Sequence, residues 1–234
     1  GKIYPNGVEV APGIAKSTIW ANKNAFEKGS GILVAKNGKR VISETASNNA
    51  IKQVELKQPD STLYILMDKP TYDGFVQGLY IGGITGGEVD SWIAKDGKGT
   101  PKFVKADTIE AAAAKIGIDG KALKQEVVRY NSFVKAGKDA DFDRPAKFMT
   151  RAVVEQGPYF IIEQQPRFAT TMGGVVTNDS FNVLDTNGKP IKGLFAAGEI
   201  VGGAMGDDSP PGGNMGWAVT SGKLAAEGAV NSMK

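Results

Sequence analysis

The residues best suited to chemistry stand near the end of the chain, in a run that finishes on a carboxylate. Residues 193–199 read Gly-Leu-Phe-Ala-Ala-Gly-Glu, which is a short apolar strand followed at once by Glu199. A strand that ends in this way delivers its carboxylate at the carboxyl end of a sheet, where it accepts hydrogen bonds from a pair of ribose hydroxyls. A solvated acid in a surface loop is the alternative for the tripeptide taken alone.

A glycine-rich stretch follows Glu199 and leads into a helix. Its glycines stand at positions 202, 203, 206, 212, 213 and 216. A loop with so few side chains lets backbone amides approach a flat ring or an anion at the positive end of the helix. A long surface turn is the alternative, but the combination with Glu199 favours a cofactor site.

Composition removes several classes of site. The 234 residues include no histidine and no cysteine, which excludes an imidazole general base, a Ser-His-Asp triad, the ordinary zinc sites and disulfides. The 28 basic and 25 acidic residues are interspersed, so there is no basic stripe of the kind that binds nucleic acid. Acid-base work must therefore fall to carboxylates, Tyr, Lys or Arg.

The hydropathy pattern indicates a soluble chain. No apolar run approaches the roughly 20 residues of a membrane span, and the first residues are polar rather than those of a signal peptide. Gly1 in place of methionine indicates a processed or engineered start. Both a cytoplasmic and an exported protein are compatible with this pattern.

The first two thirds of the chain read as α+β. Strands are expected over 31–36 and 39–42, joined by a tight turn at Asn37-Gly38, and over 63–67. A helix is expected over 48–57.

The clearest helical pattern begins after Asp119-Gly120 and ends at Gly137. Apolar residues recur there at helical spacing and form one stripe. Asp107 with Glu110 predicts a capping box before a run of alanines. The glycine-rich segment 74–87 is typical of a loop or hinge.

From residue 158 onward the pattern changes to short strands and turns, which places a domain boundary near residue 155. A last helix is expected over about 215–230. The expected strands are 159–162, 174–176, 181–184 and 194–196, with a turn over 185–188.

The end of the chain resembles the C-terminal FAD-binding segment of the fumarate reductase and urocanate reductase flavoproteins. The resemblance is carried by Gly173-Gly174-Val175, the 185–188 turn, Pro190, residues 193–199 and Gly212-Gly213-Asn214. It implies FAD as cofactor, with Glu199 on the ribose. The implied cofactor contacts are Met172, Gly173, Gly174, Gly198, Glu199, Gly213, Asn214, Met215 and Gly216, and the implied substrate contacts are Thr170, Thr171, Asp208 and Ser209.

The resemblance extends backwards into the family's capping domain. It implies residues 1–27 as a lead-in, 28–155 as the capping domain and 156–234 as the C-terminal part of the FAD-binding domain. Arg144 matches the arginine that supplies a proton while flavin N5 gives a hydride to an activated C=C bond. Because a guanidinium stays protonated in proteins, this role needs a relay. The alternative is a surface arginine that pairs with Asp141 or Asp143.

Several positions depart from the family's pattern. Ala169-Thr170-Thr171 replaces histidines, Asp207-Asp208-Ser209-Pro210-Pro211 replaces a substrate arginine, and Thr45-Ala46-Ser47-Asn48 follows Glu44 where an arginine of the proton relay is expected. Tyr4-Pro5 stands where the family has His-Pro. A dicarboxylate site needs cationic donors for two carboxylates, so fumarate itself is not expected as the substrate.

The largest departure from the family's pattern is that the glycine fingerprint of a dinucleotide-binding fold is absent from this sequence. No Gly-x-Gly-x-x-Gly follows a strand near the N-terminus, and the run 82–87 lacks the flanking strand and helix. We therefore expect this chain to be a fragment or partner chain of an FAD-dependent oxidoreductase. Its missing N-terminal FAD-binding segment would be supplied in cis or in trans. The isolated chain is expected to be inactive and to bind FAD weakly or not at all.

Two alternatives stay open. A ketosteroid-dehydrogenase-like flavoenzyme shares the Ala-Ala-Gly ending and runs the opposite reaction; an apolar pocket with a catalytic tyrosine would favour it. A cofactor-free ligand-binding or interaction module derived from the capping domain would explain the lost histidines and relay arginine. Retention of Glu199 and Arg144 argues against such a module.

Overall fold

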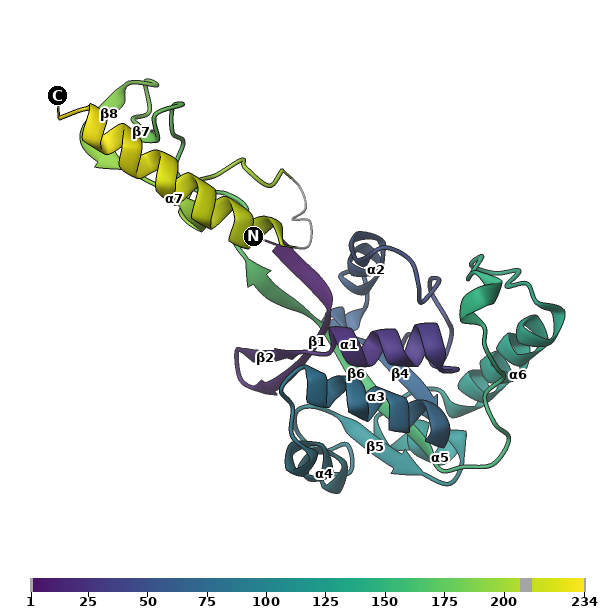
Figure 1. Ribbon diagram of the computed structural model, residues 1–234. Helices are drawn as coiled ribbons and strands as arrows, with labels where there is room; N and C mark the ends of the chain where they lie inside the picture. Colours follow the sequence, from purple (N-terminus) through teal and green to yellow (C-terminus); the bar gives the residue numbers. More distant parts are fainter. Residues whose placement is uncertain (1, 207–211, 234) are drawn as a thin grey trace. The chain divides into compact units, whose positions relative to one another are not determined.

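The computed structural model describes residues 2–206 and 212–233, which form two compact units (Figure 1). The larger unit comprises residues 4–167, and the C-terminal unit takes the described residues of the ranges 1–3 and 168–234. The division falls inside strand β6 (Tyr159–Thr170) rather than near residue 155, because this strand continues from one unit into the other. The assignment of named domains to these parts stays a prediction.

An antiparallel sheet forms the centre of the larger unit, as an α+β fold requires. Its strands follow the order β2-β1-β6-β4-β3, and β5 also pairs with β6. Antiparallel neighbours can be joined by short turns, as β1 and β2 are here. Helices lie in several of the other connections between strands. The bounds are Lys2–Ala11 for β1, Ile14–Ser17 for β2, Ile32–Val34 for β3, Leu63–Asp68 for β4 and Phe103–Ala106 for β5.

Both faces of this sheet are covered by helices, because β4 is apolar on both sides. Ile65 and Met67 pack on one face with α1, α3 and α4, whereas Tyr64 and Leu66 pack on the other with α5 and α6. Alternation of side chains along a strand produces this split. The helices are α1 (Ile19–Lys23), α2 (Asn48–Glu55), α3 (Lys69–Ile81), α4 (Gly86–Ala94), α5 (Ile109–Lys115) and α6 (Gly120–Ala136).

Most of the predicted elements of this unit are present. Helix α6 begins where the Asp119 carboxylate accepts a hydrogen bond from the amide of Ala122 at 2.9 Å, and it ends at Gly137 with φ of 68°. The turn at Asn37-Gly38 also forms, but residues 39–42 make only the single bridge between Val34 and Arg40 instead of a strand.

Two further predictions for this unit are wrong. The segment 74–87 is mainly helical, since α3 and α4 cover most of it. Gly78 is needed there because α3 lies against α1: an added Cβ would come within 2.4 Å of Ala21 Cα. Helix α5 is capped by Thr108, which accepts from the amide of Ala111 at 3.1 Å, and not by Asp107.

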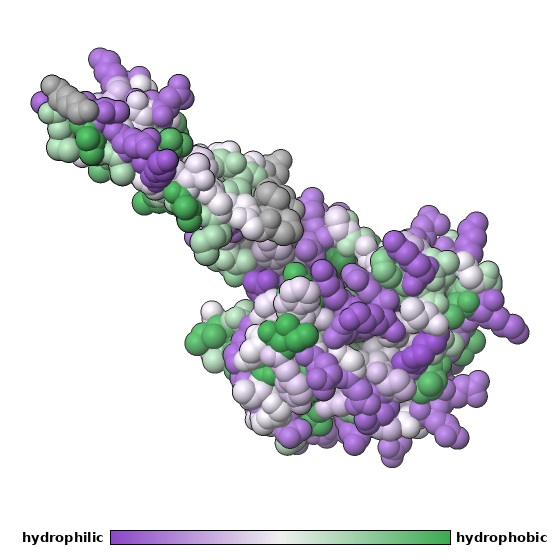
Figure 2. All heavy atoms as spheres, in the orientation of Figure 1, coloured by the Kyte–Doolittle hydropathy of each residue, from purple (hydrophilic) through white to green (hydrophobic). Residues whose placement is uncertain are grey.

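The C-terminal unit contains the predicted hairpin and last helix. Strands β7 (Asn182–Leu184) and β8 (Pro190–Phe195) pair antiparallel, and α7 runs over Gly213–Asn231. Hydrophobic side chains remain exposed on this unit (Figure 2), including Val219 and Leu224 on α7. Within residues 2–206 and 212–233, no helix has the length and apolar character needed to cross a membrane.

Candidate functional site

Glu199 is held in place by two hydrogen bonds in the C-terminal unit. It lies in the helical turn Gly198–Ile200 that follows β8, and its Oε1 accepts from the hydroxyl of Thr170 at the end of β6. The amide of Thr171 donates to the same oxygen at 3.3 Å. These two donors hold the pKa of Glu199 below its usual value, so an ionised carboxylate is presented to solvent.

Helix α7 fixes the turn that carries Glu199. The amide of Gly198 donates to Ser221 Oγ, and the carbonyl of Gly198 accepts from Trp217 Nε1, both at 2.9 Å. Gly198 has φ of 73°, a left-handed conformation that glycine adopts without strain. The Ala-Gly-Glu ending is thus positioned by the last helix.

A cavity of about 30 Å³ brings together five of the residues that the resemblance implied. Thr170, Thr171, Met172, Glu199 and Asn214 line it, with Val201, Ala204, Met205 and Trp217. A space of this size holds a water molecule but not a three-ring system. This cavity is therefore too small to enclose a flavin ring.

The remaining predicted cofactor residues differ in their surroundings. An added Cβ at Gly173 or Gly216 would meet no atom within 4 Å, and Met215 is 72% exposed, so these positions offer open backbone and side-chain surface. Gly213 opens helix α7. Gly174 is needed for packing, because an added Cβ would lie 1.9 Å from the backbone oxygen of Ile200.

These features fit part of an FAD site, namely a ribose carboxylate and an open, glycine-rich surface. They supply no cradle for the pyrophosphate among the described residues. Asp208 and Ser209, which the resemblance implied as substrate contacts, lie outside the described residues, as does the rest of the 207–211 stretch.

Arg144 is enclosed in the larger unit. It is 2% exposed, which contradicts the alternative of a surface arginine paired with Asp141 or Asp143. Its guanidinium donates to the backbone carbonyls of Gly31, Phe26 and Phe148 at 2.9, 2.5 and 3.1 Å. Nη1 also contacts Glu44 Oε2 at 3.3 Å. Arg144 therefore ties together three segments that are distant in sequence.

A second buried arginine completes this charge cluster. Arg40 donates to both carboxylate oxygens of Glu44, each at 2.7 Å, and to Asp139 at 3.2 and 2.7 Å. Burial by itself would lower the pKa of Arg40, but the two carboxylates outweigh it and raise the pKa. Both guanidinium groups lie over the ring of Tyr130, at 5.0 and 5.3 Å from its centroid. Two cations and two anions balance, as buried charges require.

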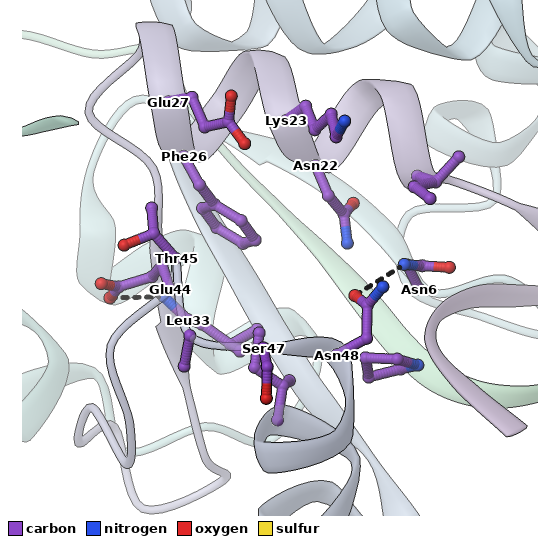
Figure 3. A pocket seen from close by; sticks show the side chains of 14 residues that line it. Asn6, Asn22, Lys23, Phe26, Glu27, Leu33, Glu44, Thr45, Ser47 and Asn48 are labelled. Carbon is purple, nitrogen blue, oxygen red and sulfur yellow. Dashed lines mark hydrogen bonds between the residues drawn. The ribbon is translucent and has the colours of Figure 1, made fainter. Parts of the chain in front are cut away.

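A cavity with a volume of about 270 Å³ lies beside this cluster in the larger unit. Figure 3 shows Asn22 from α1, Asn48 from the start of α2 and Asn6 from β1 converging on it. Glu44 forms part of its wall. The other lining residues are Pro5, Ile19, Lys23, Phe26, Glu27, Leu33, Thr45, Ala46, Ser47 and Ile51.

Sequence reasoning did not predict this cavity. Its three asparagines come from separate parts of the chain, with no spacing that marks them as a set. One signal was present, however. The chain departs from the flavoprotein pattern at Tyr4-Pro5 and from Thr45 to Asn48, and the structure places Pro5 and the second of these stretches in this wall.

Comparisons with known proteins agree with the resemblance in the sequence. The family model described as FAD binding domain matches residues 10–215. The fumarate reductase (cytochrome) of Shewanella frigidimarina is 34% identical over 203 residues, which are 87% of this chain and 32% of that protein. The urocanate reductase of Eggerthella lenta is 33% identical over 175 residues, 75% of this chain and 27% of that protein.

A solved structure agrees as well. The open conformation of a flavocytochrome c3 fumarate reductase matches with a TM-score of 0.71 and 28% identity, covering 99% of this chain and 36% of that chain. The chain thus spans about a third of the length of these proteins.

Proposed function

Since this chain belongs to the FAD binding domain family, we propose that it works as part of a longer or multi-chain FAD-dependent oxidoreductase that reduces an activated C=C bond. The observation that supports this most is the ionised Glu199 beside an open glycine-rich surface. The similarity to fumarate and urocanate reductases supports the reaction type. FAD, when bound, supplies the hydride.

In this proposal the C-terminal unit contacts the cofactor. Among the described residues, the hydrogen bonds of Glu199 go through Oε1, which leaves Oε2 for a ribose hydroxyl. Thr170 orients the carboxylate and keeps it ionised. Charge-assisted hydrogen bonds of this kind are stronger than neutral ones, so Glu199 would contribute both affinity and orientation.

The same unit offers a surface for the missing N-terminal FAD-binding segment. Helix α7 buries Ser221 and Ala225 but leaves Val219 and Leu224 exposed at 67% and 43%. Apolar surface of this kind marks a place where another part of a protein packs. We infer that the dinucleotide fold covers it, in cis or in trans, and completes the FAD site.

The substrate is proposed to bind in the larger unit and to differ from a dicarboxylate. Lys23 is the single cation among the residues described as lining the 270 Å³ cavity, and Glu27 and Glu44 also line it. A molecule with two carboxylates would need several cationic donors there. An α,β-unsaturated compound with at most one charge fits this wall better than fumarate.

The residue that donates the proton to the substrate is a separate question from where the flavin binds. The family resemblance implies this role for Arg144, but its contacts with three carbonyls favour a positioning role. By this reading Arg144 holds Glu44 in the cavity wall. Stability and activity measurements on Arg144 variants separate the two roles.

The test uses the full-length protein that contains this chain, reduced under anaerobic conditions. Reoxidation of its flavin by an α,β-unsaturated monocarboxylate or amide, with much slower reoxidation by fumarate, is the expected result. A full-length protein that holds no flavin, or whose reduced flavin no unsaturated compound reoxidises, contradicts the proposal. The isolated chain should show no stoichiometric flavin spectrum.

A cofactor-free binding module is the second candidate. The observation in its favour is that the 270 Å³ cavity is formed entirely by residues of the larger unit. Ligand binding without any flavin in the full-length protein would support it. The ketosteroid alternative is less favoured, since no tyrosine stands among the residues described as lining this cavity.

A further inference from the structure

We propose that Arg167, near the end of β6, binds the carboxylate of a small unsaturated acid and so determines which charge the preferred ligand carries. The site uses residues of the larger unit alone. Its role in selecting a substrate rests on the proposed function, whereas the binding itself can be measured without a flavin.

Arg167 is the exception among the five arginines of the chain. The other four each pair with a carboxylate at 2.5 to 3.3 Å, namely Arg40, Arg129, Arg144 and Arg151. Arg167 is half-buried, yet it forms no ion pair with any residue that the structure describes. Because charges that leave bulk water are normally compensated by an opposite charge, this guanidinium is a place where an anion can bind.

Three positions of β1 hold the Arg167 side chain. Its Cζ lies over the ring of Tyr4, 5.0 Å from the centroid, and its Nε donates to the backbone carbonyl of Asn6 at 3.2 Å. Gly7 leaves room for the aliphatic stem, because an added Cβ there would lie 2.8 Å from Arg167 Cβ. Tyr4 stands where the family's pattern has a histidine, so this contact departs from that pattern. The guanidinium is thus positioned before a ligand arrives, which lowers the entropic cost of binding.

The donors that an anion needs remain available on Arg167. A guanidinium carries five N–H donors, and only Nε of Arg167 donates to a described residue. Neither Nη atom is among the described side-chain atoms that are fully buried without a partner, so both keep accessible surface. Two such groups form a planar fork that matches the two oxygens of a carboxylate.

The charges around Arg167 also favour an anion. Burial lowers the pKa of Arg167 below its usual value, and Tyr4 is the one described group that acts in the opposite direction. The contrast is Arg151, where the hydrogen bonds from its guanidinium to Asp68 raise the pKa. An anion that reaches Arg167 therefore competes with water and not with a described carboxylate.

A single guanidinium suits one carboxylate better than a phosphate dianion. Phosphate sites usually combine several donors, such as backbone amides at a helix N-terminus or more than one cation. The described contacts of Arg167 are with Tyr4 and Asn6, and they add no second cation. One positive charge is therefore matched by one negative charge, which a monocarboxylate supplies.

The same stretch of β1 reaches the 270 Å³ cavity. Pro5 and Asn6 line this cavity, and the hydrogen bond to the Asn6 carbonyl places Arg167 next to their part of the wall. Small-molecule sites combine an apolar wall with a few polar groups. An acid that binds Arg167 therefore lies beside the cavity where the substrate is proposed to bind.

The test compares three probes on this chain: crotonate, its neutral isostere crotonamide and inorganic phosphate. Isothermal titration calorimetry gives the affinities, and the NMR signal of the Arg167 Nε–H group locates the bound probe. Crotonate should bind at least about tenfold more tightly than either of the others. Equal binding of crotonate and crotonamide, tighter binding of phosphate, or no binding of crotonate overturns the proposal.

Substitutions of Arg167 show whether it carries the binding. Arg167→Gln should weaken crotonate by at least about tenfold, the value of a charge-assisted hydrogen bond, and leave crotonamide unchanged. Arg167→Lys keeps the charge but loses the fork, so its affinity should lie between the two, and it replaces Arg167→Gln if that variant does not fold.

Arg129→Gln is the matched control for these variants. It removes one positive charge from an exposed pair with Asp141, so crotonate should bind it as tightly as it binds the parent chain. Crotonate affinity that is unchanged in both Arg167 variants, or that falls equally in Arg129→Gln, contradicts the proposal.

The full-length protein separates this inference from the proposed function. Arg167→Gln should raise the KM for crotonate and leave kcat nearly unchanged, because the carboxylate is not the group that is reduced. Reduction of crotonate with the same KM in parent and variant would overturn the carboxylate site and leave the flavoprotein proposal intact. Arg167-dependent binding of crotonate in a full-length protein without reductase activity would do the reverse.

Discussion

The hydroxyl of Thr170 donates a hydrogen bond to the carboxylate of Glu199, although the two residues stand 29 positions apart in the chain. This contact joins the end of β6 to the turn after β8. It connects a residue that replaces a histidine of the flavoprotein pattern with the carboxylate proposed to bind ribose.

Replacing Glu199 tests the cofactor role. Glu199→Gln in the full-length protein should weaken FAD binding by roughly tenfold, because an ionised acceptor is exchanged for a neutral one. Equilibrium titration of the apoprotein with FAD measures the effect. Glu227→Gln is the control, since Glu227 is an exposed acid on α7 that pairs loosely with Lys223 at 3.9 Å. Unchanged FAD affinity of Glu199→Gln would remove this residue from the site.

Arg144 should prove essential for folding stability. Arg144→Ala leaves Glu44 short of a partner and three carbonyls without their donor, so we expect a loss of about 3–5 kcal/mol in the free energy of unfolding. Arg129→Ala should leave the free energy of unfolding nearly unchanged, because Arg129 forms an exposed, solvent-screened pair with Asp141. Urea unfolding of both variants makes the comparison. An Arg144→Lys protein of normal stability that has lost reductase activity would instead support the proton-donor role.

Glu55 should make stability depend on pH. It is fully buried on α2 with neither carboxylate oxygen paired among the described residues, and desolvation raises its pKa from 4.5 to about 9. The folded state therefore holds a proton that the unfolded state releases between pH 4.5 and 9, and stability falls as pH rises through this range. The slope is about 1.4 kcal/mol per pH unit.

Glu55→Leu removes the group whose raised pKa lowers the stability of the folded chain at high pH. Compared with the parent chain, the variant should gain roughly 3 kcal/mol at pH 7 and much less at pH 5. Denaturant unfolding at the two pH values gives both numbers. Gln53→Leu, an exposed position on the same helix, controls for the added hydrophobic residue. A gain that is equal at both pH values would show that Glu55 is ionised in the folded chain.

Gly78 should not tolerate a methyl group. Gly78→Ala places a Cβ 2.4 Å from Ala21 Cα, and separating α1 from α3 should cost about 1–3 kcal/mol. Gly74→Ala lies in the same helix with only Asn24 Cβ nearby, at 3.9 Å, so it should be neutral or stabilising by up to about 1 kcal/mol. Thermal unfolding distinguishes them. Equal melting temperatures would mean that the two helices do not pack closely.

Local patterns in the sequence were sufficient for the elements that depend on nearby residues. Helix α6, the hairpin of β7 and β8 and the last helix all follow from periodicity and turn residues. The segment 74–87 was misread because its glycines resemble those of a loop. One of them, Gly78, is required by a contact with Ala21 of α1, more than 50 residues earlier in the chain, and no local pattern reports such a contact.

The sequence by itself determined the family and the part of the site that is written as one continuous run, from residue 193 through the glycines to α7. Backbone conformation and a single carboxylate suffice for that part, and both are local properties. Tertiary structure alone decided the surroundings of Arg144 and the asparagine cavity. Those depend on which distant segments pack together and on which buried polar atoms are left without a partner, and packing sets both only once the whole unit has folded.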